Sequence, residues 1–201
     1  MKLISILLIA LLANLAFAKS FLPTAFHARF SQEYTSKVSG KKVTTIGELT
    51  YSYPGHLRLE IKSPDEVLYV ANPKKSWYYT PPFAKGEPGE VKISDNPDNI
   101  LNRFFDVLKN GLSDNKSYKV AKGKTGGHVL SFLPQAAKDL GIKEAVLFFE
   151  GADEFKNLKR LKIKESDDQV KDFTLTNLDA NKVSDKSLFE FTLPENTRIS
   201  R

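Results

Sequence analysis

The chain has 201 residues, with 30 lysine and arginine residues against 24 aspartate and glutamate residues, and its formal net charge is +6 at pH 7. It contains no cysteine, which excludes a disulfide scaffold, a thiolate metal site and a lipid attached to a cysteine. The length suits one domain with a sizeable core. The lysines are spread through predicted strands and turns, which favours an ordinary solvated surface over a nucleic-acid site. Weak attraction to an anionic membrane or an acidic partner is the alternative.

Residues 1–18 have the layout of a secretory signal peptide. A positive start is followed by an apolar run over residues 3–16, and Ala16-Phe17-Ala18 forms a small-x-small cleavage site. The run is shorter than the roughly 20 residues that a membrane-spanning helix needs, which disfavours a retained anchor. We therefore expect an exported protein that is mature from Lys19 and has a single domain over residues 19–201.

Short strands separated by turn residues account for most of the remaining sequence. The clearest turn is Pro54-Gly55, and after it Leu57, Leu59 and Ile61 alternate with charged residues. This period of two predicts a strand with one dry face and one wet face. The predicted strands include residues 26–30, 43–53, 57–62, 76–79, 116–121, 128–133, 145–149, 158–163, 170–175 and 188–193.

Two predicted helices interrupt the strands. The stronger one starts at Asn96-Pro97-Asp98, because asparagine is a good N-cap and proline suits the first helical position. It ends at Asn110-Gly111. A shorter helix is predicted over residues 135–140. The stronger helix is amphipathic, and a helix of this kind most often packs as core, although it can also cover a cavity as a lid. The predicted apolar stripe of the stronger helix contains Ile100, Leu101, Phe104, Phe105, Leu108 and Leu112, and its opposite, solvated side contains Asn102, Arg103, Asp106 and Lys109.

The sequence offers no recognisable catalytic site. His27, His56 and His128 lie in separate strands or turns, without a metal-binding partner three or four residues away. Adjacent carboxylates lie in predicted turns, where neighbouring side chains of an extended chain point apart. Gly123-Lys124-Thr125 ends like a phosphate-binding loop, but Tyr118 stands where that loop needs a glycine, and no helix follows. We therefore expect no enzyme, no cofactor and no metal site.

Six segments, in this order and spacing, resemble the LolA family of periplasmic lipoprotein carriers of Gram-negative bacteria. The resemblance covers nearly all of the expected mature sequence. Its marks are the opening strand at residues 26–32, the run YSYPGHLRLE at residues 51–60, the Trp-Tyr-Tyr strand ending in proline at residues 77–81, the apolar helix at residues 100–112, the strand-proline element at residues 130–134 and the terminal FEFTLP at residues 189–194.

The resemblance implies a mainly β (α+β) fold in which a strongly curved antiparallel sheet forms an incomplete barrel, capped by short helices as a lid. It implies a monomeric periplasmic chaperone that binds the acyl chains of lipoproteins in a hydrophobic cavity, without nucleic acid. Such a carrier takes lipoproteins from an inner-membrane ABC transporter and passes them to an outer-membrane receptor. The residues expected to line the cavity and its lid are Tyr51, Tyr53, Leu57, Leu59, Ile61, Trp77, Leu101, Phe104, Phe105 and Leu108.

The sequence also departs from the family pattern. Well-studied carriers have an arginine immediately before the turn proline, where it hydrogen-bonds the lid closed, and here that place is Tyr53. A tyrosine hydroxyl donates one hydrogen bond and cannot bridge several carbonyls. An arginine introduced at this position is expected to tighten closure if carbonyls of the lid lie within its reach. Leu57 stands where some carriers have a phenylalanine used in handover to a partner, and the helix that usually precedes the first strand is shortened.

Three other functions have requirements of their own. A LolB-like receptor needs a lipidated cysteine, a regulatory sensor usually has a second domain, and an envelope hydrolase needs a nucleophile and a base. None of these requirements is met by the sequence. The alternative that stays open is a periplasmic lipid-binding or lipoprotein-sensing protein of the same fold with a different amphiphilic ligand.

Overall fold

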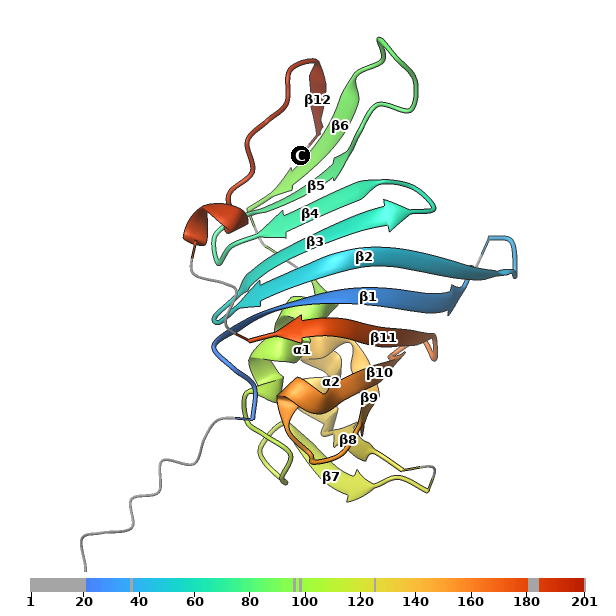
Figure 1. Ribbon diagram of the computed structural model, residues 1–201, viewed down its shortest axis with the longest axis vertical. Coiled ribbons are helices and arrows are strands. Elements are labelled where there is room, and N and C mark those ends of the chain that lie inside the picture. Colours follow the sequence, from blue (N-terminus) through green and yellow to red (C-terminus); the bar gives the residue numbers. More distant parts are fainter. Residues whose placement is uncertain are drawn as a thin grey trace, which may run out of the picture.

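The computed structural model describes residues 21–200, apart from positions 37, 96, 98, 125 and 181–184. The expected signal peptide and its cleavage site lie outside the described residues. Within them, the strands form one 12-stranded sheet, and two α-helices lie against one side of it (Figure 1). The mainly β fold class predicted from the sequence is confirmed.

The first half of the chain forms a meander of neighbouring strands, and the second half places helices between strands. The meander consists of β1 (Ala25–Thr35), β2 (Lys42–Ser52), β3 (His56–Ser63), β4 (Val67–Ala71), β5 (Ser76–Thr80) and β6 (Gly89–Ser94). The second half contains α1 (Ile100–Leu108), β7 (Tyr118–Lys122), β8 (His128–Phe132), α2 (Pro134–Leu140), β9 (Ile142–Phe149), the 3₁₀ helix η1 (Phe155–Asn157), β10 (Leu158–Glu165), β11 (Val170–Asp179), the 3₁₀ helix η2 (Lys186–Phe189) and β12 (Thr197–Ser200).

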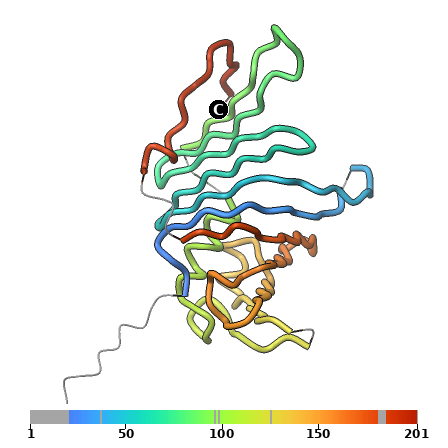
Figure 2. Tube along the Cα trace, viewed as in Figure 1, coloured from blue at the N-terminus to red at the C-terminus, as the bar shows by residue number. Residues whose placement is uncertain are grey.

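The strand order is β12-β6-β5-β4-β3-β2-β1-β11-β10-β9-β8-β7. β1 lies in the middle, between β2 and β11, so the Cα trace in Figure 2 shows the blue start of the chain beside an orange strand from its end. Neighbouring strands are antiparallel, except that β12 pairs with β6 in parallel. The sheet is therefore mixed, whereas the sequence predicted an antiparallel sheet.

The segment predicted as a strand at residues 188–193 contains the end of η2 and irregular chain instead. Its aromatic residues alternate as in a strand, but they pack across the sheet. Phe189 is buried against the His56 ring, and the Phe191 ring lies 5.4 Å from that of Tyr79. The alternation therefore marks a segment lying over a sheet face, and the strand that joins the sheet comes later, as β12.

The start of α1 also differs from the prediction. Its N-cap is Asn99, whose side-chain oxygen accepts a hydrogen bond from the Leu101 N–H at 2.9 Å. The predicted cap Asn96 lies outside the described residues. Both asparagines suit an N-cap, so composition alone could not choose between them. The shorter helix, α2, forms as predicted and ends at Gly141, whose φ of 71° places it in the left-handed region.

At Gly47, the Phe30 ring closely approaches the main chain of β2 on the concave side of the sheet, which is the side that the two helices cover. The register of β2 against β3 shifts between Ile46 and Gly47. A Cβ atom at Gly47 would lie 2.3 Å from the Glu60 carbonyl oxygen and 2.8 Å from the Phe30 ring. Glycine therefore lets the Phe30 ring cross the strand here, at an irregularity of the kind that bends sheets.

The two edges of the sheet differ. At β7, the Val120 N–H donates to the Asp114 carboxylate at 2.8 Å, and the Tyr118 N–H donates to the Asn115 side-chain oxygen at 3.2 Å. At the other edge, β12 is only four residues long.

Candidate functional site

Helix α1 packs its aromatic residues into the concave side of the sheet. The Phe105 ring lies 5.1 Å from that of Phe26 on β1 and 5.3 Å from that of Tyr51 on β2. The Phe104 ring faces the other way, 6.3 Å from that of Phe132 on β8. These contacts close the space between α1 and the sheet.

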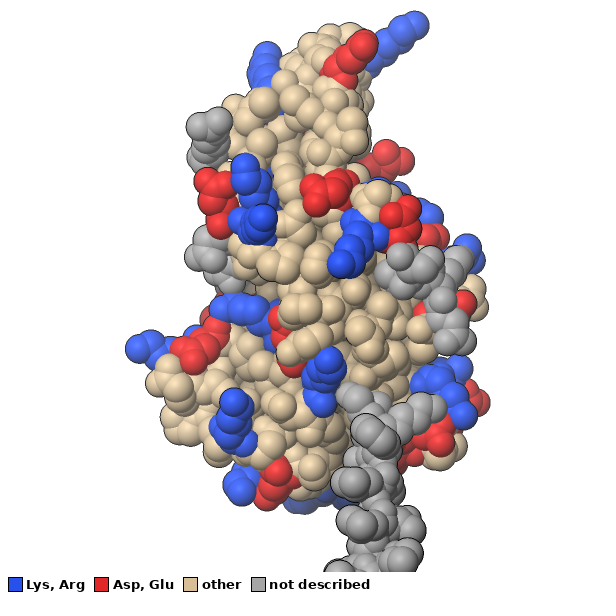
Figure 3. Space-filling model, turned by 90° about the vertical axis from the view of Figure 1, so that its left-hand side faces the viewer, with Lys and Arg blue, Asp and Glu red and all other residues tan. Residues whose placement is uncertain are grey.

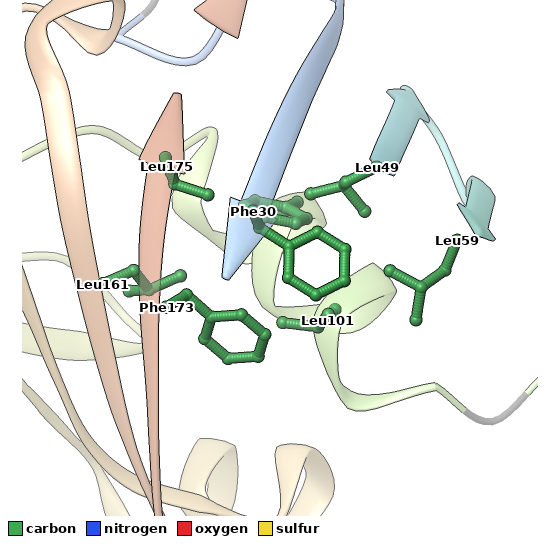
Figure 4. A pocket seen from close by; sticks show the side chains of 8 residues that line it. Phe30, Leu49, Leu59, Leu101, Leu161, Phe173 and Leu175 are labelled. Carbon is green, nitrogen blue, oxygen red and sulfur yellow. The ribbon is translucent and has the colours of Figure 1, made fainter. Parts of the chain in front are cut away.

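A small apolar cavity remains beside these rings, between α1 and five strands (Figure 4). Its volume is about 10 Å³, which gives room for about one water molecule. As the described residues are placed, this cavity is too small to hold an acyl chain. The lining residues are Phe30, Leu49, Leu59, Leu101, Phe105, Leu161, Phe173 and Leu175.

Most of the predicted site residues share one apolar cluster. They come from the concave faces of β2 and β3 and from the apolar side of α1. Leu59 and Ile61 are partly buried, and the others are nearly inaccessible. The residues brought together in this way are Tyr51, Leu57, Leu59, Ile61, Leu101, Phe104, Phe105 and Leu108.

Trp77 is separated from this cluster by the sheet. It pairs with Val70, which pairs with Arg58, so these three side chains share a face. Leu59 pairs with Tyr69 and lies on the opposite, concave face. The Trp77 ring instead lies 6.4 Å from that of Phe191, in the segment that crosses the back of the sheet.

The polar side of α1 was predicted to be solvated, but part of it contacts the β2–β3 turn. Its residues at spacings of four and three, Asn102, Asp106 and Lys109, face the β2–β3 turn, and we call them the turn-facing edge. The Asp106 carboxylate oxygen Oδ1 accepts from the Tyr51 hydroxyl at 2.5 Å and from the Gly55 N–H at 3.2 Å. The Asn102 side-chain amide donates to the Gly55 carbonyl oxygen at 3.0 Å. Helical periodicity identified this side as polar but gave no sign of what it would contact.

Burial raises the pKa of the Tyr51 hydroxyl, and its hydrogen bond to the Asp106 carboxylate raises it further. The hydroxyl therefore stays protonated at neutral pH and acts as the donor, while the carboxylate acts as the acceptor.

Arg103, on the neighbouring side of α1, binds the second helix. Its guanidinium donates to the carbonyl oxygens of Asp139 and Leu140, at the C-terminal end of α2. The last carbonyls of a helix lack partners within it, so a cationic donor suits this place.

The histidines of the described chain are not gathered into a metal-binding group. His27, His56 and His128 lie on different strands, and no group of three histidine, aspartate or glutamate side chains is placed to hold a metal ion in the part that the structure describes. None of the described helices is long and apolar enough to span a membrane. On the face shown in Figure 3, basic side chains lie beside acidic ones.

Sequence comparison identifies the family. The family described as outer membrane lipoprotein carrier protein LolA matches residues 23–192 of the chain. The chain belongs to the LolA family.

Individual LolA relatives are distant but cover most of the chain. An outer-membrane lipoprotein carrier protein of Pseudoalteromonas translucida is 28% identical over 176 residues, which is 87% of this chain and 80% of that protein. Another, of Shewanella pealeana, is 29% identical over 177 residues, with 86% and 77% covered. The solved structure of a LolA superfamily protein from Nitrosomonas europaea aligns over 84% of this chain and 91% of its own, with a TM-score of 0.41 and 7% identity. Because that score is low, the assignment rests on the sequence matches.

Two positions that depart from the LolA pattern have clear environments. Tyr53, at the expected arginine position, is 38% exposed, and the Lys109 ammonium lies 3.4 Å from the centre of its ring. This is a cation–π contact between the turn and the end of α1. Leu57, at the expected phenylalanine position, is fully buried.

Proposed function

We propose that this LolA family protein carries lipoproteins through the periplasm by enclosing their acyl chains between α1 and the concave face of the sheet. The observation that supports this most is the composition of the closed space. Side chains from β1, β2, β3, β10, β11 and α1 meet there, and all eight that line the small cavity are apolar. Outward movement of α1 would uncover a surface suited to acyl chains and poorly suited to polar ligands.

The energy of the cargo explains why a carrier is needed. At about 0.8 kcal/mol per methylene, an acyl chain of roughly sixteen carbons faces a barrier of order 12 kcal/mol to enter water. Unaided crossing of an aqueous compartment is too slow at that cost. A lining without polar groups shields the chain and forms no directional bonds to it, which suits a protein that must later release its cargo.

The proposed route begins at an ABC transporter of the inner membrane and ends at a receptor of the outer membrane. Family membership and the secretory layout of residues 1–18 support this route. Leu57 is buried in the closed form, so handover through this side chain would require movement of the lid or the turn.

Lipoprotein release from spheroplasts tests the proposal. Spheroplasts of a Gram-negative bacterium depleted of its own carrier are incubated with the purified protein, and lipoproteins in the supernatant are measured by immunoblotting and then offered to outer-membrane vesicles. We expect release and transfer with this protein, and none with albumin in its place. Failure to release lipoproteins, combined with binding of another lipid in mass spectra of the purified protein, would refute the carrier role in favour of a general lipid-binding one.

A further inference from the structure

The contact between α1 and the β2–β3 turn uses both main-chain groups of one residue. The Asp106 carboxylate accepts from the Gly55 N–H, and the Asn102 amide donates to the Gly55 carbonyl oxygen. Gly55 has a φ of 68°, in the left-handed region that favours glycine. The turn therefore presents a fixed donor and acceptor pair to the helix, and the turn-facing edge binds both.

Tyr51 belongs to this polar contact and to the apolar interior at the same time. Its ring packs 5.3 Å from the Phe105 ring and 5.4 Å from the Phe26 ring. Its hydroxyl reaches the Asp106 carboxylate, and the side chain is fully buried. A hydrogen bond to a charged acceptor is among the stronger ones in proteins, especially when it is shielded from water.

Phe105 and Asp106 are adjacent on α1, so the apolar and polar contacts form or break together. An acyl chain entering the cavity must separate Phe105 from Tyr51, and the same outward movement of α1 draws Asp106 away from Tyr51 and Gly55. The closed lid and the bound acyl chain therefore exclude each other. The contacts that form only in the closed state stabilise that state, and their free energy lowers the affinity for an acyl chain.

One atom at this contact works against closure. Asn102 is 4% exposed, and its side-chain oxygen Oδ1 has no hydrogen-bond partner among the described residues. A buried acceptor without a partner is unfavourable, and it would gain water when α1 moves outward. Closure is therefore held by Asp106 and opposed by Asn102 Oδ1, which is the balance expected of a contact that must open.

We propose that Tyr51 and Asp106 form a latch that sets how readily the protein accepts and releases acyl chains. The proposal rests on the proposed function for the acyl cargo, and it concerns the regulation of that same site. Binding of an acyl chain breaks the latch, and re-forming the latch favours release. Weakening the latch should therefore raise acyl affinity, whereas loss of an ordinary packing residue would lower it.

Tyr51→Phe tests the latch, because it removes the hydroxyl and keeps the ring in the interior. Asp106→Ala removes the acceptor from the other side. The matched control is Tyr79→Phe, which makes the same chemical change on the back of the sheet, where the ring lies beside Phe191. For each protein, hydrogen exchange of the α1 amides is measured without ligand, and affinity is measured with a fluorescent sixteen-carbon fatty acid.

We expect α1 amides to exchange about tenfold faster in Tyr51→Phe and Asp106→Ala, with β1 and β11 unchanged, because one strong hydrogen bond corresponds to about that factor. The fatty acid should bind several-fold more tightly to both variants, and Tyr79→Phe should match the unchanged protein. The double variant should add little to Asp106→Ala, since that substitution already removes the bond from Tyr51.

The results separate the latch from the proposed function. Unchanged α1 exchange in both variants, or weaker fatty-acid binding by Tyr51→Phe, overturns the latch even if the protein carries acyl chains. Faster α1 exchange in the variants, with no fatty-acid binding by any protein, supports the latch and counts against the acyl cargo.

Discussion

The guanidinium of Arg103 donates to the carbonyl oxygen of Leu140, 3.3 Å away, so a side chain of α1 holds the end of α2. It also donates to the carbonyl oxygen of Asp139, one residue earlier. Two main-chain acceptors at the end of one helix are thus bound by a single residue of the other. The two helices are expected to move as one body, and whatever moves α1 also moves α2.

Replacing Arg103 tests this connection. Arg103→Met keeps much of the apolar stem and removes the donors, so the free energy of unfolding should fall by about 1.5 kcal/mol or more, the value of hydrogen bonds to charged groups. Urea denaturation measures the change. Arg29→Met is the matched control, because Arg29 forms an exposed ion pair with Glu48, and exposed pairs contribute about 0–1 kcal/mol. Equal losses in the two variants would contradict a special role for Arg103.

A crosslink between α1 and the sheet should lock the protein closed. Phe105 and Leu59 line the same small cavity, and the chain has no cysteine, so a Phe105→Cys/Leu59→Cys variant carries only two thiols. A short bifunctional thiol reagent should join them without ligand and abolish uptake of a fluorescent acyl probe. The control pair, Ser31→Cys/Ile46→Cys, joins neighbouring residues of β1 and β2 and should leave uptake intact. Uptake that survives a confirmed lid crosslink would show that α1 is not the gate.

The structure changes what is expected of an arginine at position 53. The Lys109 ammonium lies over the Tyr53 ring, so Tyr53→Arg replaces a cation–π contact by two like charges. Closure should therefore loosen, although the family pattern suggested the opposite. Hydrogen exchange of α1 measures this, and Tyr53→Phe, which keeps an aromatic face, is the control. Slower exchange in Tyr53→Arg would show that the new guanidinium reaches carbonyls of the lid.

The single tryptophan provides a test of which face the cargo uses. Trp77 lies on the back of the sheet beside Phe191, and the expected cargo lies on the concave side. Its fluorescence should stay nearly constant when a fatty acid binds, and it should shift in Phe191→Ala, which exposes the indole. A large change on fatty-acid binding, equal to that of Phe191→Ala, would place the cargo or a coupled movement at the back of the sheet.

Acid should weaken the β7–β8 hairpin through Asp153. Hydrogen bonds from Lys122 and then from His128 hold the pKa of Asp153 below its usual value of 3.8. Because the pKa of this carboxyl is lower in the folded protein than in the unfolded chain, its charge stabilises the fold at pH values above the unfolded pKa of 3.8. This contribution is lost as the pH falls below 3.8 and through the folded pKa. Asp153→Asn should therefore flatten the stability profile in that acid range, as measured by thermal unfolding against pH. A profile as steep as that of the unchanged protein would rule out this contribution.

Much of the fold could be predicted because the alternation of apolar and polar residues along a strand indicates that one face of the strand is buried. Residues 128–133 and 158–163 show this, and they form β8 and β10. The same alternation misled at residues 188–193, because a chain lying across a sheet face also buries every second residue. Trp77 was misplaced for a related reason. Trp77, Tyr78 and Tyr79 are all aromatic, so the pattern of β5 does not say which face is concave.

The candidate site was predicted only where apolar periodicity was sufficient. The apolar side of α1 follows directly from the spacing of Leu101, Phe105 and Leu108, and these residues are buried together. The turn-facing edge was missed because Asn102 and Asp106 look like solvated residues on a helical projection. Their partners on Tyr51 and Gly55 are about fifty residues away, and only the tertiary fold brings them together.

The two ends of the sheet have a consequence for how the molecules behave toward one another. An open sheet offers bare main-chain groups at its outer strands, which invites other chains to add to it. At β7, the side chains of Asp114 and Asn115 already occupy two of these donors. At the other end, the chain uses its own last strand to cover β6, leaving only a four-residue border that carries Arg198. Both outer strands are thereby poor templates for another chain, which protects the protein from polymerising through its own sheet.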